Sequence, residues 1–335
     1  MKTNDPWKVD EALFPASGSI SDRLRFLLRY AVLAPSSHNT QPWKFRLNGP
    51  CIDIFMDEEG WLRVCDDDQR ELHISVGCCL ENLLVAADHF GLGHKVAYLP
   101  DPENPMHATA VEFEDGAAAN PLGDSVLFQM IPVRHTNHGE YDGRPIPENV
   151  LEQLSGCCHE PEVHVQLTSD HSIRQMVDEL VVQADAMEFA DPAFREELGY
   201  WIGQGVFGTS WLMSKIGRLA ITHINMGNST AKKDSAVLMS SPVLGLISSK
   251  DNSRETQIKI GQVYQRLSLL AASCGIWCQP MSQIVQVEET AQKLSELQPD
   301  SNLFPQLPFR LGFAEPERHH TPRRTLEEIV VEQHD

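Results

Sequence analysis

Two periodicities organise the hydrophobic positions of this chain. Apolar residues recur with the spacing of a helix between residues 24 and 31, and Pro35 stops the pattern. Residues 43–47 then alternate between apolar and charged side chains, which predicts a half-buried strand, and residues 52–56 predict its partner across an Asn-Gly-Pro turn. A capped helix and a strand pair are therefore expected after an irregular stretch at residues 1–18.

The same two patterns continue along the rest of the chain. Strands are predicted at residues 94–99, 109–113, 163–167, 243–248, 276–287 and 305–314, and helices at residues 71–91, 123–130, 150–154, 255–274 and 288–297. Residues 171–235 predict mostly helix with an uneven pattern. The small, breaker-rich stretch 115–121 is the best boundary in the first half.

Two of the predicted helices are copies of one another. The residues Asp67-x-x-Arg70-Glu71-x-x-Ile74-x-Val76-Gly77 align without a gap with Asp251-x-x-Arg254-Glu255-x-x-Ile258-x-Ile260-Gly261. Glycine on one face of a helix lets a second helix approach closely. One pair of long copies predicts two related halves about a pseudo-twofold axis, as in a dimer whose two subunits are fused into one chain. A chance likeness of two amphipathic helices is the alternative.

Composition limits the classes of protein that this chain can be. It has 335 residues, of which 41% are hydrophobic and 22% charged, enough for one large or two ordinary globular domains. The net charge of −20 argues against a nucleic-acid or anionic-membrane partner. No apolar run has the length of a membrane span and the charged start is unlike a signal peptide, so a cytoplasmic protein is expected.

Cysteine usage favours neither disulfides nor a metal. Eight cysteines occur, none in a C-x-x-C arrangement, and at this length a disulfide framework is not expected. Cys157-Cys158-His159-Glu160 could bind a metal, but a helix end with buried thiols is the favoured interpretation.

The most informative stretch is a polar loop bounded by prolines, Pro35-Ser36-Ser37-His38-Asn39-Thr40-Gln41-Pro42-Trp43. The prolines stiffen the chain, and the short side chains between them offer hydroxyl, amide and backbone N–H groups. Such a loop suits a flat heteroaromatic ligand with carbonyl and ring-nitrogen acceptors. The alternative is a helix–strand connection whose polar groups only satisfy the local backbone.

Basic residues gather at two places in this acidic chain. One is Arg134-His135-Thr136, and the other is the C-terminal group Arg310, Arg318, His319, His320, Arg323 and Arg324. Guanidinium groups bind a phosphate monoester in bidentate fashion, so a phosphate site is predicted. The alternative for the C-terminal group is a solvated run of charge.

Two other enzyme motifs are poorly supported. Residues 203–208 read G-x-G-x-x-G, but a helical pattern precedes them and no acidic residue occurs from 209 to 233, which disfavours a dinucleotide-binding site. No G-x-S-x-G elbow of a serine hydrolase is present, and His38 is better explained as a loop residue than as a base.

Taken in order, these motifs resemble a known family. The stretch from Ala34 to Trp43, the Arg-His-Thr segment and the terminal Arg-Arg-x-Leu are similar to those of the nitroreductase superfamily of FMN flavoproteins. The chain length, the two-half organisation and residues 66–72 resemble its single-chain Acg-type branch. The resemblance implies an α+β fold in which FMN lies between residues 1–120 and residues 121–335, with a lid at about 199–233.

The resemblance also assigns roles to individual residues. It implies an FMN site made by Pro35, Ser36, Ser37, Asn39, Gln41, Arg134, His135, Thr136, His138, Pro280, Met281, Ser282, Arg323 and Arg324, with a backbone N–H near Met281, Ser282 or Gln283 facing flavin N5. Two positions depart from the family pattern, because His138 and Thr321 stand where a basic residue is usual. A neutral histidine stabilises reduced, anionic flavin less than a fixed cation does.

The implied activity is that of an FMN-dependent oxidoreductase. Hydride or electrons would pass through flavin N5 to a small organic acceptor, with no catalytic side chain and no metal. NADH, NADPH or neither could be the donor. The alternative is an FMN-holding protein whose closed lid allows little turnover. Either protein could be a monomer, with its internal pseudo-dimer, or a homodimer.

Overall fold

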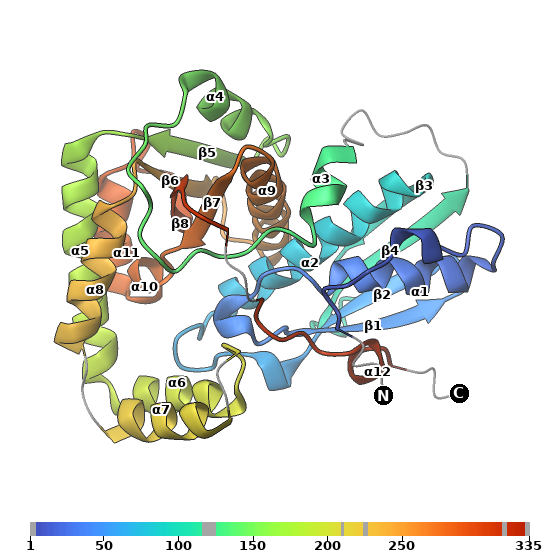
Figure 1. Cartoon of the computed structure of the whole chain (residues 1–335), viewed down its shortest axis with the longest axis horizontal. Helices are drawn as coiled ribbons and strands as arrows, with labels where there is room; N and C mark the ends of the chain where they lie inside the picture. Colours follow the sequence, from blue (N-terminus) through green and yellow to red (C-terminus); the bar gives the residue numbers. More distant parts are fainter. Residues whose placement is uncertain (1–4, 116–124, 209–210, 224–226, 317–319, 332–335) are drawn as a thin grey trace.

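Two antiparallel sheets of four strands, each beside a long buried helix, form the two halves of the molecule (Figure 1). The computed structural model describes residues 5–115, 125–208, 211–223, 227–316 and 320–331. The first sheet has the order β1-β2-β4-β3, with β1 Trp43–Asn48, β2 Cys51–Met56, β3 Leu92–Tyr98 and β4 His107–Asp115. The second has the order β5-β6-β8-β7, with β5 Val163–Thr168, β6 Val243–Ser249, β7 Ile276–Pro280 and β8 Phe304–Phe313.

The two halves repeat one another element by element. Helix α2 (Arg70–His89) and helix α9 (Arg254–Ser273) each have 20 residues, and their ends are 184 positions apart, as predicted from the sequence repeat. The strands that follow them, β3 and β7, begin at the same offset. In both halves the third and fourth strands of the chain order are exchanged in the sheet. The predicted two-half α+β fold is therefore confirmed.

The remaining helices lie around this repeat. They are α1 Ile20–Ala31, α3 Ser125–Met130, α4 Glu148–Gly156, α10 Gln283–Gln286, α11 Glu288–Glu296 and α12 Leu326–Ile329, with short 3-10 helices at Glu11–Leu13, Ser37–Asn39 and Glu58–Gly60. Ser19 and Asp22 form a reciprocal cap at the start of α1, which satisfies backbone N–H groups that the helix itself leaves unpaired. In the described part of the chain, no helix combines the length and the hydrophobicity needed to cross a membrane.

One long insertion distinguishes the second half from the first. Strands β1 and β2 are joined by a turn at Gly49 and Pro50, whereas β5 and β6 are separated by α5 His171–Ala190, α6 Pro192–Gln204, α7 Trp211–His223 and α8 Gly227–Met239. Helices α6 and α7 pack as a pair, and Figure 1 shows them below the two sheets, next to the first half. The predicted lid lies inside this insertion.

The halves meet where α2 crosses α9. A Cβ atom on Gly77 would lie 1.9 Å from the carbonyl oxygen of Ile258, and one on Gly261 would lie 2.0 Å from that of Ile74. Only glycine at both positions therefore allows the two backbones to come this close. Further along the crossing, Arg266 forms a buried bidentate ion pair with Glu81 at 2.7 and 3.1 Å, which fixes the helices in register.

The structure corrects the sequence interpretation in two segments. Residues 276–287 were expected to be extended throughout, but in this segment only β7 is a strand. The chain then turns into α10, because the N–H of Met281 donates to the carbonyl oxygen of Pro308 and that of Val285 donates to the carbonyl oxygen of Ser282. The N-terminal stretch is not simply a tail, because the indole N–H of Trp7 donates to the carbonyl oxygen of Thr321. The C-terminal segment also returns to the first sheet, where Val331 donates to Phe45.

We expect Gly261→Ala to lower the free energy of unfolding by about 2 kcal/mol or more, because the added methyl group meets the backbone of α2 and the helices must separate. Urea unfolding, followed by circular dichroism, measures this. Gly156→Ala at the end of α4 is the matched control, since no atom lies within 4 Å of the added Cβ. Equal stability of the two variants would contradict the close crossing.

Candidate functional site

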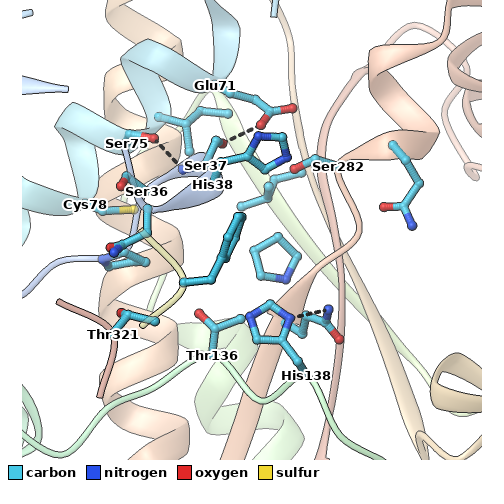
Figure 2. A pocket seen from close by; sticks show the side chains of 18 of the residues that line it. Ser36, Ser37, His38, Glu71, Ser75, Cys78, Thr136, His138, Ser282 and Thr321 are labelled. Carbon is cyan, nitrogen blue, oxygen red and sulfur yellow. Dashed lines mark hydrogen bonds between the residues drawn. The ribbon is translucent and has the colours of Figure 1, made fainter. Parts of the chain in front are cut away.

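A cavity of about 420 Å³ lies on the seam between the halves. Its walls include the proline-bounded loop and one face of α2 from the first half. The second half contributes Arg134, His135, Thr136, His138, Gln279, Pro280, Ser282, Gln283, His320, Thr321 and Arg323. Figure 2 shows Ser37, Glu71 and Ser75 on one side of the cavity and Thr136, His138 and Thr321 on the other. The volume is within the range of small-molecule and cofactor sites.

The proline-bounded loop has a strained backbone. His38, Asn39 and Gln41 have φ values of 48°, 53° and 53°, in the left-handed region that side chains other than glycine rarely adopt. The backbone N–H of Gln41 closes the loop by donating to Ser36 Oγ at 2.9 Å. Strain of this kind concentrates at functional sites, and it persists because surrounding contacts hold the loop in place.

The amide side chains of the loop hold the C-terminal segment. Asn39 donates to the carbonyl oxygens of Val206 and Pro322 at 2.7 and 3.0 Å, and its own oxygen accepts from Arg323 at 2.8 Å. The side-chain oxygen of Gln41 accepts from the backbone N–H of Arg324 at 2.7 Å. Asn39 lines the cavity whereas Gln41 does not, so Gln41 positions the segment from behind.

Two buried arginines lie at one end of the cavity without an acidic partner. Arg134 is 4% exposed and Arg323 is 9% exposed, and neither forms an ion pair within the described residues. The Nε atoms of both are buried and have no hydrogen-bond partner there. Burial and the charge of Arg134 lower the pKa of Arg323 to about 9, which shows how unfavourable this pair is without an anion.

Other contacts of these arginines shape the anion end. Arg323 donates to the carbonyl oxygens of Leu33 and Ala34 at 3.3 and 3.2 Å, and its guanidinium lies 4.6 Å from the centre of the Trp7 ring. The same ring stacks on His320 at 4.1 Å. Trp7 therefore closes this end, although nothing in the sequence of the N-terminal stretch indicated a role in a site.

Residues 134–138 run beside β7. Thr136 forms a parallel bridge with Cys278, and the ring of His135 lies 4.0 Å from that of Trp277. Burial, followed by the nearby positive charge of Arg134, lowers the pKa of His135 to about 4, so this ring is neutral near pH 7. His135, Thr136 and His138 all line the cavity.

His138 is held by a short chain of hydrogen bonds. The amide of Gln279 lies 3.1 Å from His138 Nδ1, the contact drawn as a dashed line at His138 in Figure 2. The oxygen of Gln279 accepts from Arg310 Nε at 2.6 Å. Since the amide nitrogen is the donor, Nδ1 accepts and the ring proton lies on Nε2. Desolvation on the cavity side, then the charges of Arg310 and Lys233, lower the pKa of His138, which favours the neutral ring although part of the side chain is solvent-exposed.

The turn after β7 contributes backbone and side chains. Pro280, Ser282 and Gln283 line the cavity, whereas the Met281 side chain is buried in a separate hydrophobic cluster with Val177 and Ile284. In the described chain, the backbone N–H groups of Ser282 and Gln283 donate to no other residue. They are therefore available to a ligand.

Arg324 does not line the cavity. Its guanidinium donates to Asp57 at 2.8 Å and to the carbonyl oxygen of Gln41 at 3.3 Å. The idea that it helps to hold a phosphate is thus not supported by its position, and its role is to anchor the C-terminal segment. Arg318 and His319 of the predicted basic group lie outside the described residues.

Four acidic side chains on the cavity wall were missed by the sequence interpretation. They are Glu71 of α2, Asp185 and Glu188 of α5, and Asp234 of α8. Glu71 accepts from the hydroxyl of Ser37 and from the amide of Gln286, the latter at 2.7 Å. Only Glu71 belonged to a motif, the helix repeat. Acidic residues on a predicted helix are usually solvent-exposed, so the other three gave no signal.

Apolar side chains from the inserted helices cover the cavity. Phe189, Phe194, Leu198 and Phe207 line it, and Glu197 fixes this cover to the first half by accepting the backbone N–H groups of Val64 and Cys65. The G-x-G-x-x-G motif at 203–208 follows helix α6 and not a strand, so it lacks the context of a dinucleotide-binding turn.

Comparison with known proteins gave relatives over most of the chain. No family model matches the chain. A Mycobacterium tuberculosis protein with the provisional name NAD(P)H nitroreductase is 25% identical over 324 residues, covering 92% of this chain and 91% of the relative. A second M. tuberculosis protein, provisionally named NAD(P)H nitroreductase acg, is 24% identical over 324 residues, which cover 92% of this chain and 95% of that relative.

Solved structures give looser likenesses. The FMN-dependent nitroreductase NfnB from Mycobacterium smegmatis in complex with NADPH superposes with a TM-score of 0.40 and 16% identity, over 61% of this chain and 96% of that one. A nitroreductase with bound FMN from Bacteroides fragilis gives a TM-score of 0.38 and 16% identity, over 60% and 95%.

We expect Asp185→Asn to raise the thermal stability of the flavin-free protein at pH 8 and to change it little at pH 4. Burial, then the charge of Asp234, raises the pKa of Asp185 to about 7 in the folded protein. Between about pH 4, the ordinary pKa of an aspartate in an unfolded chain, and pH 7, the folded state therefore keeps a proton that the unfolded chain has released. Wild-type stability therefore falls as pH rises toward 7, and asparagine removes this loss. Melting temperatures across this pH range measure it, and a difference that does not depend on pH would contradict the assignment.

Proposed function

Since the chain is an Acg-like member of the nitroreductase superfamily, we propose that it is an FMN-binding oxidoreductase that passes hydride or electrons to a small organic acceptor. The observation that carries this proposal is the pair of buried arginines, Arg134 and Arg323, at the end of a cavity of cofactor size. Two desolvated guanidinium groups without an acid call for an anion, and a phosphate monoester suits their geometry.

The residues present fit FMN. Arg134 and Arg323 would hold the phosphate, with Thr321 and His320 beside them on the cavity wall. His135 and Thr136, which are aligned on β7, would face the ribityl chain and the pyrimidine edge. Pro35 and Ser36, with the strained backbone of the loop, would support the ring from the first half. Bound FMN would supply reversible hydride acceptance at N5.

The protein's own groups would orient and tune that chemistry. The unengaged backbone N–H groups of Ser282 and Gln283 are candidates to hydrogen-bond the ring nitrogen that accepts the hydride. His138, with its proton on Nε2, would donate a hydrogen bond while remaining neutral. A neutral donor stabilises negative charge on the ring less than a cation does, so a lower flavin potential is expected than with a basic residue there.

The apolar cover would exclude water from the reacting face. Phe189, Phe194 and Leu198 lie on helices that are fixed to the first half through Glu197. Exclusion of water strengthens the electrostatic contacts inside and protects a reduced cofactor from side reactions. Substrate would have to enter past this cover, so its opening would set the rate of exchange.

One chain supplies every part of this site. Because the loop and the arginines come from the two halves of a single pseudo-dimer, a monomer is sufficient for binding, although a homodimer is compatible with it. The relatives named as NAD(P)H nitroreductases make a nicotinamide the first donor to test. Eight free cysteines are compatible with a reducing compartment, which supports the cytoplasm as the place of action.

We expect the double variant Arg134→Ala, Arg323→Ala to be purified without flavin, while the wild type releases FMN on denaturation. Absorbance at the flavin bands per mole of protein measures this. Arg144→Ala is the control, because that arginine lies in an exposed loop outside the cavity and should leave the flavin content unchanged. Full occupancy in the double variant would overturn the phosphate assignment.

We expect anaerobic NADH or NADPH to bleach the flavin of the wild-type protein, and an added nitroaromatic or quinone to restore its colour. Stopped-flow absorbance measures both half-reactions. The alternative of an FMN-holding protein predicts that neither nicotinamide bleaches the flavin although dithionite does. That result would reject turnover with nicotinamide while leaving FMN binding intact.

A further inference from the structure

Carboxyl groups gather on one part of the cavity wall and have no cationic partner. Asp185 and Glu188 lie one turn apart on α5, so they share a face of that helix, and Asp234 joins them from α8. In the described part of the chain none of the three has a lysine, arginine or histidine within ion-pair distance. The proposed flavin site does not use them.

Their oxygens are also incompletely satisfied. Asp185 is only 3% exposed, and its Oδ2 atom is buried without a hydrogen-bond partner among the described residues. Gln283 engages the side chain of Asp185 from the turn after β7. Glu188 Oε1 is buried and unpartnered in the same way. Two acceptors that face one cavity therefore lack donors, which is costly unless a ligand supplies them.

The charges that act on this group are mostly of the same sign. The pKa of Asp185 is raised by burial and then by the charge of Asp234. The pKa of Glu188 is raised well above its usual range by burial and then by the charges of Asp185, Glu71 and Asp234. Lys233 and Arg310 only moderate the effect at Asp234. Arg134 and Arg323 are not among the main causes of these shifts.

A structural role explains this arrangement poorly. A buried carboxyl that only fills space can be replaced by an apolar side chain without loss, whereas Asp185, buried without a cation and beside two further acidic groups, weakens the fold. A metal ion is also a poor match, because no group of three or more His, Cys, Asp or Glu side chains in the described part of the chain is arranged to hold one. An organic cation with N–H groups would supply both the charge and the missing donors.

We propose that Asp185, Glu188 and Asp234 recognise an amine, amidine or guanidine group of the substrate, so that the oxidoreductase prefers cationic acceptors. This inference rests on the proposed function and specifies its substrate class. The cavity is then bipolar, with an arginine end for the phosphate of FMN and an acidic wall for the charge of the substrate. Acceptors that carry a carboxylate are excluded by repulsion.

The test uses three matched nitroaromatic probes of nearly equal size: para-nitrobenzylamine, para-nitrobenzyl alcohol and para-nitrobenzoate. Their dissociation constants for the purified, oxidised protein are measured by titration calorimetry at pH 8. We expect the amine to bind at least about tenfold more tightly than the alcohol, and the benzoate to bind most weakly, as for a charge that is paired in a buried site.

Two isosteric variants locate the effect. Asp185→Asn and Glu188→Gln should each reduce the preference for the amine over the alcohol by about fivefold or more, with little change in the alcohol itself. Glu179→Gln is the matched control, because this carboxylate is exposed on the same helix and does not line the cavity. Melting curves and flavin content show whether each variant is folded and loaded.

The outcomes separate this inference from the proposed function. If the protein contains FMN but binds the amine and the alcohol equally, the inference is overturned and the flavin site stands. A preference that survives both substitutions would also overturn it. Calorimetry does not depend on the flavin, so the preference for the amine can also be measured in protein that contains no FMN. The absence of FMN would reject the proposed function, but it would not by itself overturn this inference.

Discussion

The close crossing of α2 and α9 is the constraint on which the rest of this structure depends. Gly77 and Gly261 replace side chains with direct backbone contact, and each would collide with the facing carbonyl if it carried a Cβ atom. The buried pair of Glu81 and Arg266 then selects one register for the two helices. A shift of this crossing would move the loop on the first half relative to the arginines on the second.

The crossing also explains why a symmetrical framework makes an asymmetrical site. The repeat places Glu255 and Lys259 of α9 where α2 has Glu71 and Ser75 on the cavity wall. At the related position, Lys259 bonds to Glu162 and Glu255 at 2.6 and 2.8 Å and lies 5.3 Å from the centre of the Tyr98 ring. The long side chain of Lys259, paired with two glutamates, thus stands where α2 has the short side chain of Ser75.

The sequence predicted the framework well because the framework depends on local signals. The helix repeat, its two glycines and the strand alternation are periodic features, and each is repeated in both halves. The proline-bounded loop and Arg134 were identified because rare residue types occur there in order. Met281 and Arg324 were assigned to the FMN site by their positions in a motif. The Met281 side chain instead packs in the hydrophobic cluster with Val177 and Ile284, and the Arg324 guanidinium binds Asp57 outside the cavity.

The site features that could not be predicted from the sequence depend on contacts between segments that are far apart in the chain. Trp7 reaches the cavity because Thr321, more than three hundred positions away, accepts its indole N–H. Asp185 and Glu188 have the composition of a solvated helix face, and only the docking of α5 beside α8 and the turn after β7 buries Asp185 and part of the Glu188 side chain. Burial changes their chemistry, because a carboxyl that would be ionised in water is held close to neutrality.

The strained loop and the unpaired charges point to one conclusion about how stability is distributed. His38, Asn39 and Gln41 adopt unfavourable backbone angles, two arginines are buried in the same cavity, and the buried carboxyl of Asp185 lies near those of Glu188 and Asp234 on another part of its wall. Each arrangement weakens the fold by itself. All of them line or border the one cavity, whereas the helix crossing next to it is closely packed and contains the buried ion pair of Glu81 and Arg266. A phosphate at one end and a cation at the other would remove the largest of these costs, so ligand binding and the completion of folding are expected to be coupled at this seam.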